Sequence, residues 1–306
     1  MEILKDIVIL LVSIAVIGKG AGWLVDSAAR VAERLGTSEL VIGLTIVAFG
    51  TSAPEFGVTI LAALRGMGDI SVGNIVGSNI FNLGFILGGT AIVHSLKTSR
   101  IVIRRDGFFL LFGAILLSVF LWDLVLSRIE GVILVTLLVL YLIQLYVKKQ
   151  PLETELTSHG MYWWDPLVLL AGLGMVLIGS HFLVESAVTL ARLIGVSDWV
   201  IGTTIIAAGT SAPEFATSMA AALKSRYGMS VGNLIGSDIF NLFGVLGLAG
   251  ILGDLRVGEE ARVNLVILSL MVVIVLLFMR TGWIVSRREG VILVLIGLLR
   301  WIYSFS

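Results

Sequence analysis

The chain alternates between long stretches with almost no charged residues and short stretches in which polar and charged residues gather. Apolar windows of about 18–25 residues are long enough for an α-helix to cross the hydrocarbon core of a bilayer. The pattern predicts ten such helices, at residues 4–25, 38–64, 70–93, 107–125, 129–147, 165–186, 198–223, 228–252, 262–280 and 288–305. We therefore expect an all-α integral membrane protein with ten transmembrane helices.

The composition agrees with this class and narrows the chemistry. Hydrophobic residues make up 58% of the 306 residues and charged residues 14%, whereas about 25% of a typical soluble domain is charged. The chain has no cysteine, which excludes disulfides, thiolate metal sites and cysteine nucleophiles. The first apolar stretch lacks the basic start and the small-residue cleavage site of a secretory signal, so we interpret it as a true span.

The basic residues are distributed unevenly along the ten predicted spans. The 21 basic and 21 acidic residues balance to a net charge of zero. If the N-terminus lies outside the cell, about two thirds of the basic residues fall in cytoplasmic segments, as the positive-inside rule requires. We expect a multi-pass protein of the cell membrane with both termini extracellular.

Two motifs occur once in each half of the chain. GTSAPEF stands at residues 50–56 and again at 209–215, and SVGNIVGSNIFNL at 71–83 matches SVGNLIGSDIFNL at 230–242. A single shift of 159 residues aligns both motifs without a gap. Over roughly 70 aligned positions about half are identical, including Gly, Pro, Asn and Glu, which indicates an internal duplication.

The duplication predicts two five-helix halves, at residues 1–147 and 165–306, joined by a short polar linker at 148–164. An odd number of spans in each half makes the second half enter the membrane from the opposite side. Inverted repeats are typical of secondary transporters, whose binding sites lie near the midplane between the repeats. We expect function to reside in the membrane, because the predicted connections are short.

Each GTSAPEF copy places a proline inside a predicted helix. Pro54 and Pro213 remove an intrahelical hydrogen bond and clash with the carbonyls of Gly50 and Gly209, four residues earlier. Backbone carbonyls freed at membrane depth are tolerated only where they line a cavity or bind something. Carbonyls at the C-terminal end of a half-helix suit a cation, so we predict broken helices at the midplane.

A glutamate follows each proline near the middle of its span. A carboxylate costs at least about 2.5 kcal/mol at the centre of a bilayer and by default marks a functional site. Glu55 and Glu214 would meet across the pseudo-twofold axis of the two halves. Hydroxyl groups three and four residues before each glutamate can share its helix face; they belong to Ser52 and Thr51 in the first half and to Ser211 and Thr210 in the second.

The second motif adds neutral oxygen atoms. Ser78 and Asn82 are four residues apart on one predicted helix, as are Ser237 and Asn241. No histidine recurs with the motifs, so the ligand set is all oxygen, which suits hard cations such as Ca²⁺, Na⁺ or Mg²⁺. Mg²⁺ dehydrates reluctantly whereas Ca²⁺ takes 6–8 oxygens in flexible geometry, so a dry cage in the membrane favours Ca²⁺.

The paired G-T-S-x-P-E and G-S-x-x-x-N motifs resemble the alpha repeats of the cation/calcium antiporter superfamily, in particular its prokaryotic sodium/calcium exchangers. The resemblance covers essentially the whole chain. It implies ten helices and alternating access of a four-part site that binds Ca²⁺ or about three Na⁺. The carboxylates of Glu55 and Glu214 and the backbone oxygens of Thr51 and Thr210 would then bind Ca²⁺. Flanking Na⁺ sites would use Ser52, Ser78, Ser211 and Ser237 with the backbone oxygens of Ala48 and Ala207, and Asn82 and Asn241 would complete the middle.

One position departs from the superfamily pattern. Many sodium/calcium exchangers carry an aspartate where Asn241 stands, and its absence leaves two carboxylates in the expected site. Asp238, which aligns with Asn79 of the first half, is interpreted as a polar contact beside the pathway. The proton/calcium branch usually reads G-N-x-x-E around its acidic residue, which this chain lacks. We expect Ca²⁺ to be exchanged for Na⁺, with a Ca²⁺/H⁺ antiporter as the alternative.

Two further classes compete with an antiporter. A passive cation channel is compatible with a broken helix but usually needs a continuous or oligomeric pore. An intramembrane hydrolase using Ser52 or Ser211 would need a base, and none of the three histidines recurs with the motif. We expect no enzyme activity and no cofactor beyond the transported ions. The lipid bilayer is the expected partner, nucleic acid is not, and a monomer is compatible with the pattern, which leaves the oligomeric state open.

Overall fold

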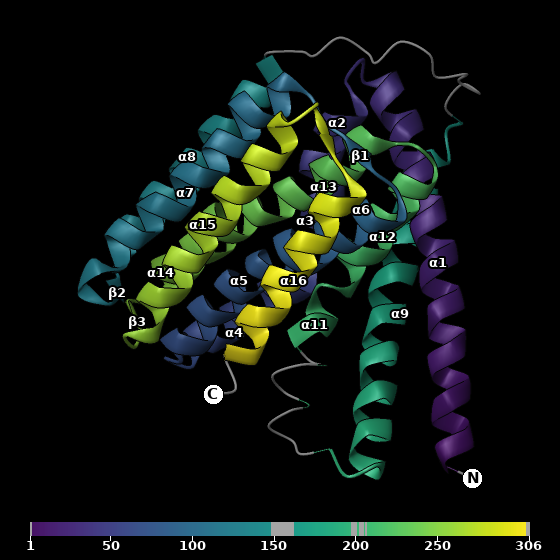
Figure 1. Cartoon of the computed structure of the whole chain (residues 1–306), viewed down its shortest axis with the longest axis horizontal. Coiled ribbons are helices and arrows are strands. Elements are labelled where there is room, and N and C mark those ends of the chain that lie inside the picture. Colours follow the sequence, from purple (N-terminus) through teal and green to yellow (C-terminus); the bar gives the residue numbers. More distant parts are fainter. Residues whose placement is uncertain (1, 148–161, 197–200, 202–204, 206, 304–306) are drawn as a thin grey trace.

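The computed structural model describes residues 2–147, 162–196, 201, 205 and 207–303 and is shown in Figure 1. The prediction of an all-helical protein is confirmed, because the only strands in these residues are four of two residues each. Most of the predicted linker at 148–164 lies outside the described residues.

The first half consists of helices separated by short π-helical segments, one 3-10 turn and two strands. They are α1 (Glu2–Arg34), α2 (Glu39–Ile42), η1 (Gly43–Val47), α3 (Ala48–Thr51), α4 (Ala53–Leu64), α5 (Gly68–Phe81), η2 (Asn82–Ile86), α6 (Leu87–Val93), β1 (Leu96–Lys97), η3 (Val102–Gly107), α7 (Phe108–Phe120), η4 (Leu121–Asp123), β2 (Val125–Leu126) and α8 (Arg128–Val147).

The second half follows a similar order. Its described elements are α9 (Asp165–Leu193), α11 (Ala207–Thr210), α12 (Ala212–Leu223), α13 (Tyr227–Ile239), η6 (Phe240–Val245), α14 (Leu246–Leu252), β3 (Leu255–Arg256), α15 (Glu260–Arg280), β4 (Ile284–Val285) and α16 (Arg287–Tyr303).

The helices are long and apolar enough for a multi-pass membrane protein. Within the described residues, seven continuous helical stretches pass a test of length and hydropathy for a membrane span. The bent pair Glu39–Thr51 and Ala53–Leu64 makes an eighth if it is one span. Of the two other predicted spans, 288–305 corresponds to α16, which has 17 residues. The segment 198–223 lies partly outside the described residues, so the count of ten remains a prediction.

Burial distinguishes a central pair of helical stretches from the peripheral helices. An 18-residue window is 89% buried within Tyr227–Leu252 and 72% buried within Gly68–Val93, but 28% buried in α1, in α8 and in α9. Figure 1 shows α1 and α9 side by side at one edge of the bundle. The two stretches that carry the repeated SVGN motif therefore form the centre of the molecule.

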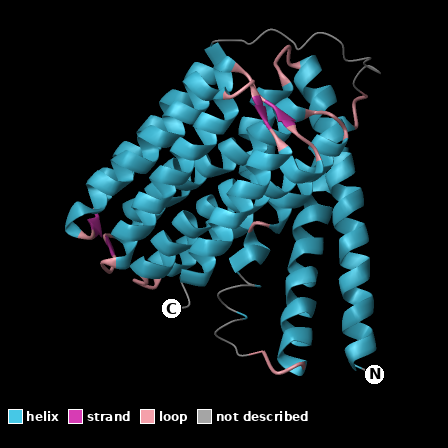
Figure 2. Ribbon diagram, viewed as in Figure 1, coloured by secondary structure: helices cyan, strands magenta, loops and turns pink. Residues whose placement is uncertain are grey.

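Two short strand pairs join the halves reciprocally. β1 pairs antiparallel with β4 through Leu96 opposite Val285, and β2 pairs antiparallel with β3 through Leu126 opposite Leu255. The 159-residue shift turns one pair into the other. Figure 2 shows the pairs at opposite ends of the helix bundle. Equivalent connections of the two halves thus lie at opposite ends of the molecule.

Candidate functional site

Both GTSAPEF copies lie where one helix ends and another begins. Ser52 separates α3 from α4 with φ −77° and ψ 8°, and the two helical stretches it joins are bent by 52°. Ser211 separates α11 from α12 with φ −89° and ψ 7°. Pro54 and Pro213 stand in the first turn of the following helix, where a missing N–H is tolerated. Their lack of an N–H also leaves the carbonyl four residues earlier without its usual donor.

Glycine before each break allows α9 to cross closely. A Cβ atom added at Gly50 would lie 2.7 Å from Cδ2 of Leu173, and one added at Gly209 would lie still closer to Cγ2 of Val184. Leu173 and Val184 are three helical turns apart on α9. The same helix therefore covers both breaks, and a larger residue at position 50 or 209 would require Leu173 or Val184 to shift.

The two glutamates are completely buried in the first turns of α4 and α12. Positive partial charge at a helix N-terminus favours a carboxylate there. The hydroxyl of Ser211 donates to Oε1 of Glu55 over 2.9 Å, and that of Ser52 donates to Oε1 of Glu214 over 3.0 Å. Spacing along one helix had placed Ser52 with Glu55. The structure instead crosses the partners, so each carboxylate receives its serine from the other half.

The threonines and small residues of the motif line the same region. The hydroxyl of Thr51 lies 3.2 Å from Oδ1 of Asn233, to which it donates, and 3.3 Å from the carbonyl oxygen of Ala48. The Ala48 carbonyl also accepts a bond of 3.1 Å from the Ser52 amide. Thr210 approaches the carboxylate of Glu55. Ala207 begins α11, and its side chain lies outside the described residues.

The second motif contributes polar groups from α5, α13 and the π-helical segments that follow them. Ser78 and Ser237 are buried, and the Ser237 hydroxyl lies 3.5 Å from Oε1 of Glu214, as a long hydrogen bond. Asn82 begins η2 and Asn241 is the second residue of η6. Both asparagines are completely buried. The structure thus brings Ser237 beside Glu214 and buries the other serine and both asparagines of the motif within the bundle.

Amide groups of the two halves also bond crosswise. Nδ2 of Asn82 donates to Oδ1 of Asp238 over 2.9 Å, and Nδ2 of Asn241 donates to Oδ1 of Asn79 over 3.0 Å. The Nδ2 atom of Asn79 in turn donates to the backbone oxygen of Asp238 over 3.0 Å. Asp238 therefore contacts Asn82, a residue of the expected site. The sequence predicts only that Asp238 is a polar contact beside the pathway.

Several acceptor oxygens in this region have no donor. Those that are buried and unpartnered in the described part of the chain are Oε2 of Glu55, Oε2 of Glu214, Oδ1 of Asn82, Oδ1 of Asn241 and Oδ2 of Asp238. A buried acceptor without a partner costs about 1–3 kcal/mol, so native proteins rarely leave one unsatisfied. A set of unpaired acceptors, with donors used up elsewhere, is suited to a cation. Within the described residues no three His, Cys, Asp or Glu side chains converge, so neutral oxygens must complete any such site.

The family model described as "Sodium/calcium exchanger protein" matches residues 5–147 and 164–302. The chain belongs to the sodium/calcium exchanger family. The resemblance inferred from the paired motifs is thereby confirmed, and the family is one of transporters rather than enzymes.

The relatives of this exchanger-family chain match it over nearly its whole length. Sodium/calcium exchanger MaX1 of Methanosarcina acetivorans is 33% identical over 335 aligned residues, covering 95% of both chains. Putative antiporter CaxA of Alkalimonas amylolytica is 36% identical over 302 residues, covering 94% of this chain and 95% of the relative. A solved structure of the sodium-calcium exchanger NCX_Mj superposes with a TM-score of 0.87 at 29% identity, over 99% of this chain and 100% of the other.

Asn74 and Asn233 of this exchanger-family protein form hydrogen bonds to α4 and α12, the helices that follow the two breaks. Nδ2 of Asn74 donates to the Thr59 hydroxyl and Nδ2 of Asn233 to the Ser218 hydroxyl, each over 2.9 Å. The Asn74 amide also donates over 3.4 Å to the backbone oxygen of Glu55, and the Asn233 amide over 3.4 Å to that of Glu214. Both asparagines belong to the repeated SVGN motif, and their partners Thr59 and Ser218 are also related by the 159-residue shift.

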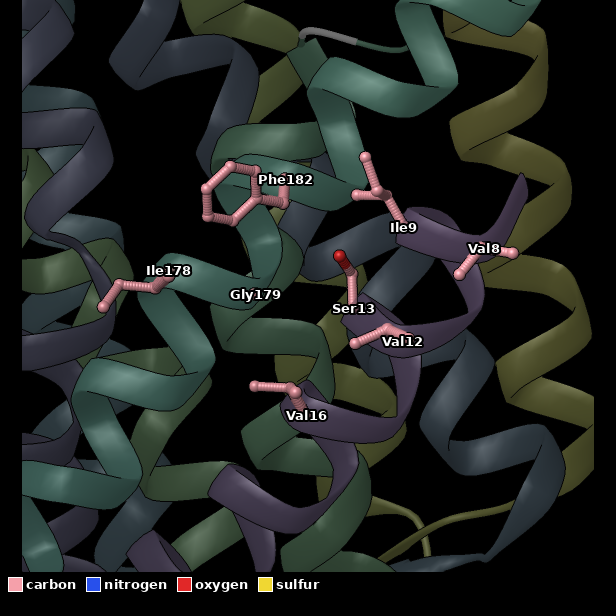
Figure 3. Close-up of a pocket in the computed structure, with 8 residues that line it drawn as sticks. All are labelled: Val8, Ile9, Val12, Ser13, Val16, Ile178, Gly179 and Phe182. Carbon is pink, nitrogen blue, oxygen red and sulfur yellow. The ribbon is translucent and has the colours of Figure 1, made fainter. Parts of the chain in front are cut away.

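A separate groove of about 340 Å³ lies between α1 and α9 (Figure 3). Figure 3 shows Val8, Val12 and Val16 of α1 across from Ile178 and Phe182 of α9, with the Ser13 hydroxyl as a polar group. The lining has no charged side chain, so it lacks the ligands that a cation needs. The candidate ion site is the buried cluster at the helix breaks.

Proposed function

We propose that this protein is a secondary active antiporter that exchanges Ca²⁺ for Na⁺ by alternating access. The observation that carries the proposal is the group of unpartnered buried acceptors around Glu55 and Glu214. Family membership and the likeness to proteins named sodium/calcium exchangers support the same ions. Paired carboxylates at membrane depth are costly unless a cation offsets their charge.

The ligand types favour Ca²⁺ as the divalent substrate. Ca²⁺ accepts 6–8 oxygens in flexible geometry, from carboxylates, carbonyls and amides. Glu55 and Glu214 would supply two negative charges to match one divalent ion, and the backbone oxygens of Thr51 and Thr210 would complete its shell. The carboxylates come from opposite halves, so the Ca²⁺ site forms where the halves meet.

Na⁺ would compete for the same cluster. It also prefers oxygen ligands, and hydroxyl groups suit its single charge. We assign the Na⁺ positions to Ser52, Ser78, Ser211 and Ser237 with the backbone oxygens of Ala48 and Ala207, and the middle of the site to Asn82 and Asn241. The hydroxyls of Ser52 and Ser211 bond directly to the carboxylates of Glu214 and Glu55. Na⁺ at these serines and Ca²⁺ at the carboxylates would therefore occupy one cluster and exclude each other, which is the requirement for exchange.

Alternating access requires that the site open to either side of the membrane. The crossed hydrogen bonds and the reciprocal strand pairs at opposite ends of the bundle support ten spans in two inverted halves. The uneven distribution of basic residues supports both termini outside the cell. The position of α1 and α9 side by side at one edge of the bundle (Figure 1) supports their sliding past a fixed core. α9 also packs at both helix breaks, so its movement would change access to the site.

The function is tested by Na⁺-gradient-driven uptake of radioactive Ca²⁺ into proteoliposomes. We expect Glu55→Gln and Glu214→Gln each to abolish uptake, because one charge of the divalent site is lost. Glu259→Gln is the matched control, since its side chain is 72% exposed and lies at the start of α15. Retained uptake in both site variants would contradict the assignment.

The coupling ion is tested in the same vesicles with Na⁺, K⁺ and H⁺ gradients imposed one at a time. We expect the Na⁺ gradient to drive Ca²⁺ uptake and the K⁺ gradient to have no effect. Uptake driven by a pH gradient alone would replace Na⁺ by H⁺ as the coupling ion.

The inverted arrangement is tested by single-cysteine labelling, because the chain has no native cysteine. Lys97 on β1 and Arg256 on β3 are exposed and related by the 159-residue shift. A membrane-impermeant thiol reagent should label Lys97→Cys from the cytoplasmic side and Arg256→Cys from the outside. Labelling of both from one side would contradict inverted halves.

A further inference from the structure

Asp238 is an acidic residue at the centre of the bundle that the ligand assignment above leaves unused. It lies on α13 and is completely buried. Its Oδ1 atom accepts a hydrogen bond of 2.9 Å from Nδ2 of Asn82, and its Oδ2 atom has no donor among the described residues. A buried carboxylate in a membrane protein is costly, so its retention requires a role.

The repeat provides an internal comparison for this contact. In the equivalent position of the first half stands Asn79, whose Oδ1 accepts from Nδ2 of Asn241 over 3.0 Å. In both contacts an asparagine of the site donates its amide to the other half and keeps its own Oδ1 unpartnered. The two contacts differ in one respect, since the acceptor is a carboxylate in one and an amide in the other.

The chemistry of the acceptor decides how firmly the asparagine is held. Nδ2 of Asn79 already donates to the backbone oxygen of Asp238, so Asn79 presents its Oδ1 to Asn241. Asn82 and Asn241 must therefore both turn Nδ2 toward the other half and Oδ1 away. The bond from Asn82 goes to a charged acceptor and is the stronger of the two. Asn82 is thus held more firmly with its oxygen free than Asn241 is.

We propose that Asp238 is a positioning residue that raises the cation affinity of the site by holding Asn82 in its ligating orientation. The proposal rests on the proposed function. It makes the two halves of the site unequal, because the more firmly held amide oxygen belongs to the first half. Asp238 does not replace a missing ligand at position 241 but acts through position 82.

The test measures equilibrium binding of radioactive Ca²⁺ to the purified full-length protein in detergent. Asp238→Asn restores the pair found at Asn79 and Asn241 and keeps the size of the side chain. We expect its Kd for Ca²⁺ to rise about tenfold, the difference between a charge-assisted and a neutral hydrogen bond. In the Asn82→Ala background the same substitution should change the Kd less than about twofold, because the group through which it acts is gone.

A pair of alanine variants gives a second, independent readout. Asp238→Ala removes the charged acceptor of Asn82, and Asn79→Ala removes the neutral acceptor of Asn241. We expect Asp238→Ala to raise the Kd for Ca²⁺ more than Asn79→Ala does, because the bond to a charged acceptor is the stronger one. If Asp238→Asn does not fold, this comparison still decides the matter.

Three outcomes would overturn the proposal. The first is an unchanged Kd in Asp238→Asn, with or without a lower melting temperature. The second is a full tenfold loss that persists in the Asn82→Ala background, which would show a direct effect of charge. The third is a Kd that rises as much in Asn79→Ala as in Asp238→Ala. If the wild-type protein binds Ca²⁺ and Glu55→Gln does not, any of these results refutes the role of Asp238 alone; if neither is so, the proposed function fails first.

Discussion

The hydroxyl of Ser52 donates a hydrogen bond of 3.0 Å to the carboxylate of Glu214, a residue 162 positions away in the other half of the chain. The reciprocal bond joins Ser211 to Glu55 over 2.9 Å. Each glutamate therefore receives a hydrogen bond from the helix break in the other half of the chain. Neither half contains a finished site, and the carboxylates gain these donors only when the halves pack together.

The crossed bonds predict matched phenotypes for Ser52→Ala and Ser211→Ala. Each variant removes a hydroxyl that we assign to a Na⁺ position, while both Ca²⁺ carboxylates remain. We expect the Na⁺ concentration that half-inhibits Ca²⁺ binding to rise about tenfold, as for the loss of a bond to a charged group. The measurement is competition of Na⁺ with radioactive Ca²⁺ on the purified protein.

Ser118→Ala is the control for this pair. The Ser118 hydroxyl bonds to the Ala114 carbonyl within α7 and serves no residue of the site. Its competition curve should match the wild type. Unequal effects of Ser52→Ala and Ser211→Ala, with one at the wild-type value, would contradict equivalent roles for the two serines.

Asn74 and Asn233 should differ in their contribution to stability. Asn233 is completely buried, donates to Ser218 and accepts from Thr51. Asn74 is half-buried and donates to Thr59. Because a buried group that loses its partner costs about 1–3 kcal/mol, Asn233→Ala should destabilise the protein more than Asn74→Ala. Thermal unfolding in detergent measures both, and an equal or reversed order would contradict the contacts.

Close helix packing beside the site should make Gly236 intolerant of substitution. A Cβ atom there would lie 2.7 Å from both Cα and the carbonyl oxygen of Leu44 and 2.8 Å from Cβ of Ala48. Backbone atoms cannot rotate away, so Gly236→Ala should cost about 1–3 kcal/mol, as overpacking does. Gly57→Ala is the matched control, because its Cβ would meet no atom within 4 Å. Equal melting temperatures for the two variants would refute this packing.

The strand pairs predict two engineered disulfides. Lys97 pairs with Ile284 and Val125 with Arg256, and directly opposed residues on antiparallel strands lie within reach of a disulfide. We expect Lys97→Cys with Ile284→Cys, and Val125→Cys with Arg256→Cys, to cross-link on oxidation and retain Na⁺-driven Ca²⁺ uptake. The mismatched pair Lys97→Cys with Val125→Cys should not cross-link within one molecule. Loss of uptake on cross-linking either matched pair would show that these connections move during transport.

The sequence predicted the helical class and the family because both leave a signal that is local or repeated. Apolar length identifies a span, and the 159-residue shift selects Glu55 and Glu214 from 21 acidic residues. The expected span at 288–305 corresponds to α16, which the structure describes over Arg287–Tyr303.

The partners of the site residues were beyond sequence reasoning for a physical reason. Helical spacing relates side chains on one helix, so it placed Ser52 with Glu55, whereas helix packing brings Ser52 to Glu214. Asp238 breaks the repeat, and a mismatch gives no hint of its neighbour. Its bond to Asn82 depends on how α13 crosses α5 and η2, which no periodicity records.

The strand pairs join the two halves by backbone hydrogen bonds at both ends of the bundle. β1 pairs with β4, and β2 with β3. The connections that carry these strands flank α6, α7, α8, α14, α15 and α16, so the pairs hold these six helices together. α1 and α9 adjoin neither pair and lie at one edge of the bundle (Figure 1). In the proposed exchange, α1 and α9 could therefore shift while both strand pairs stay intact.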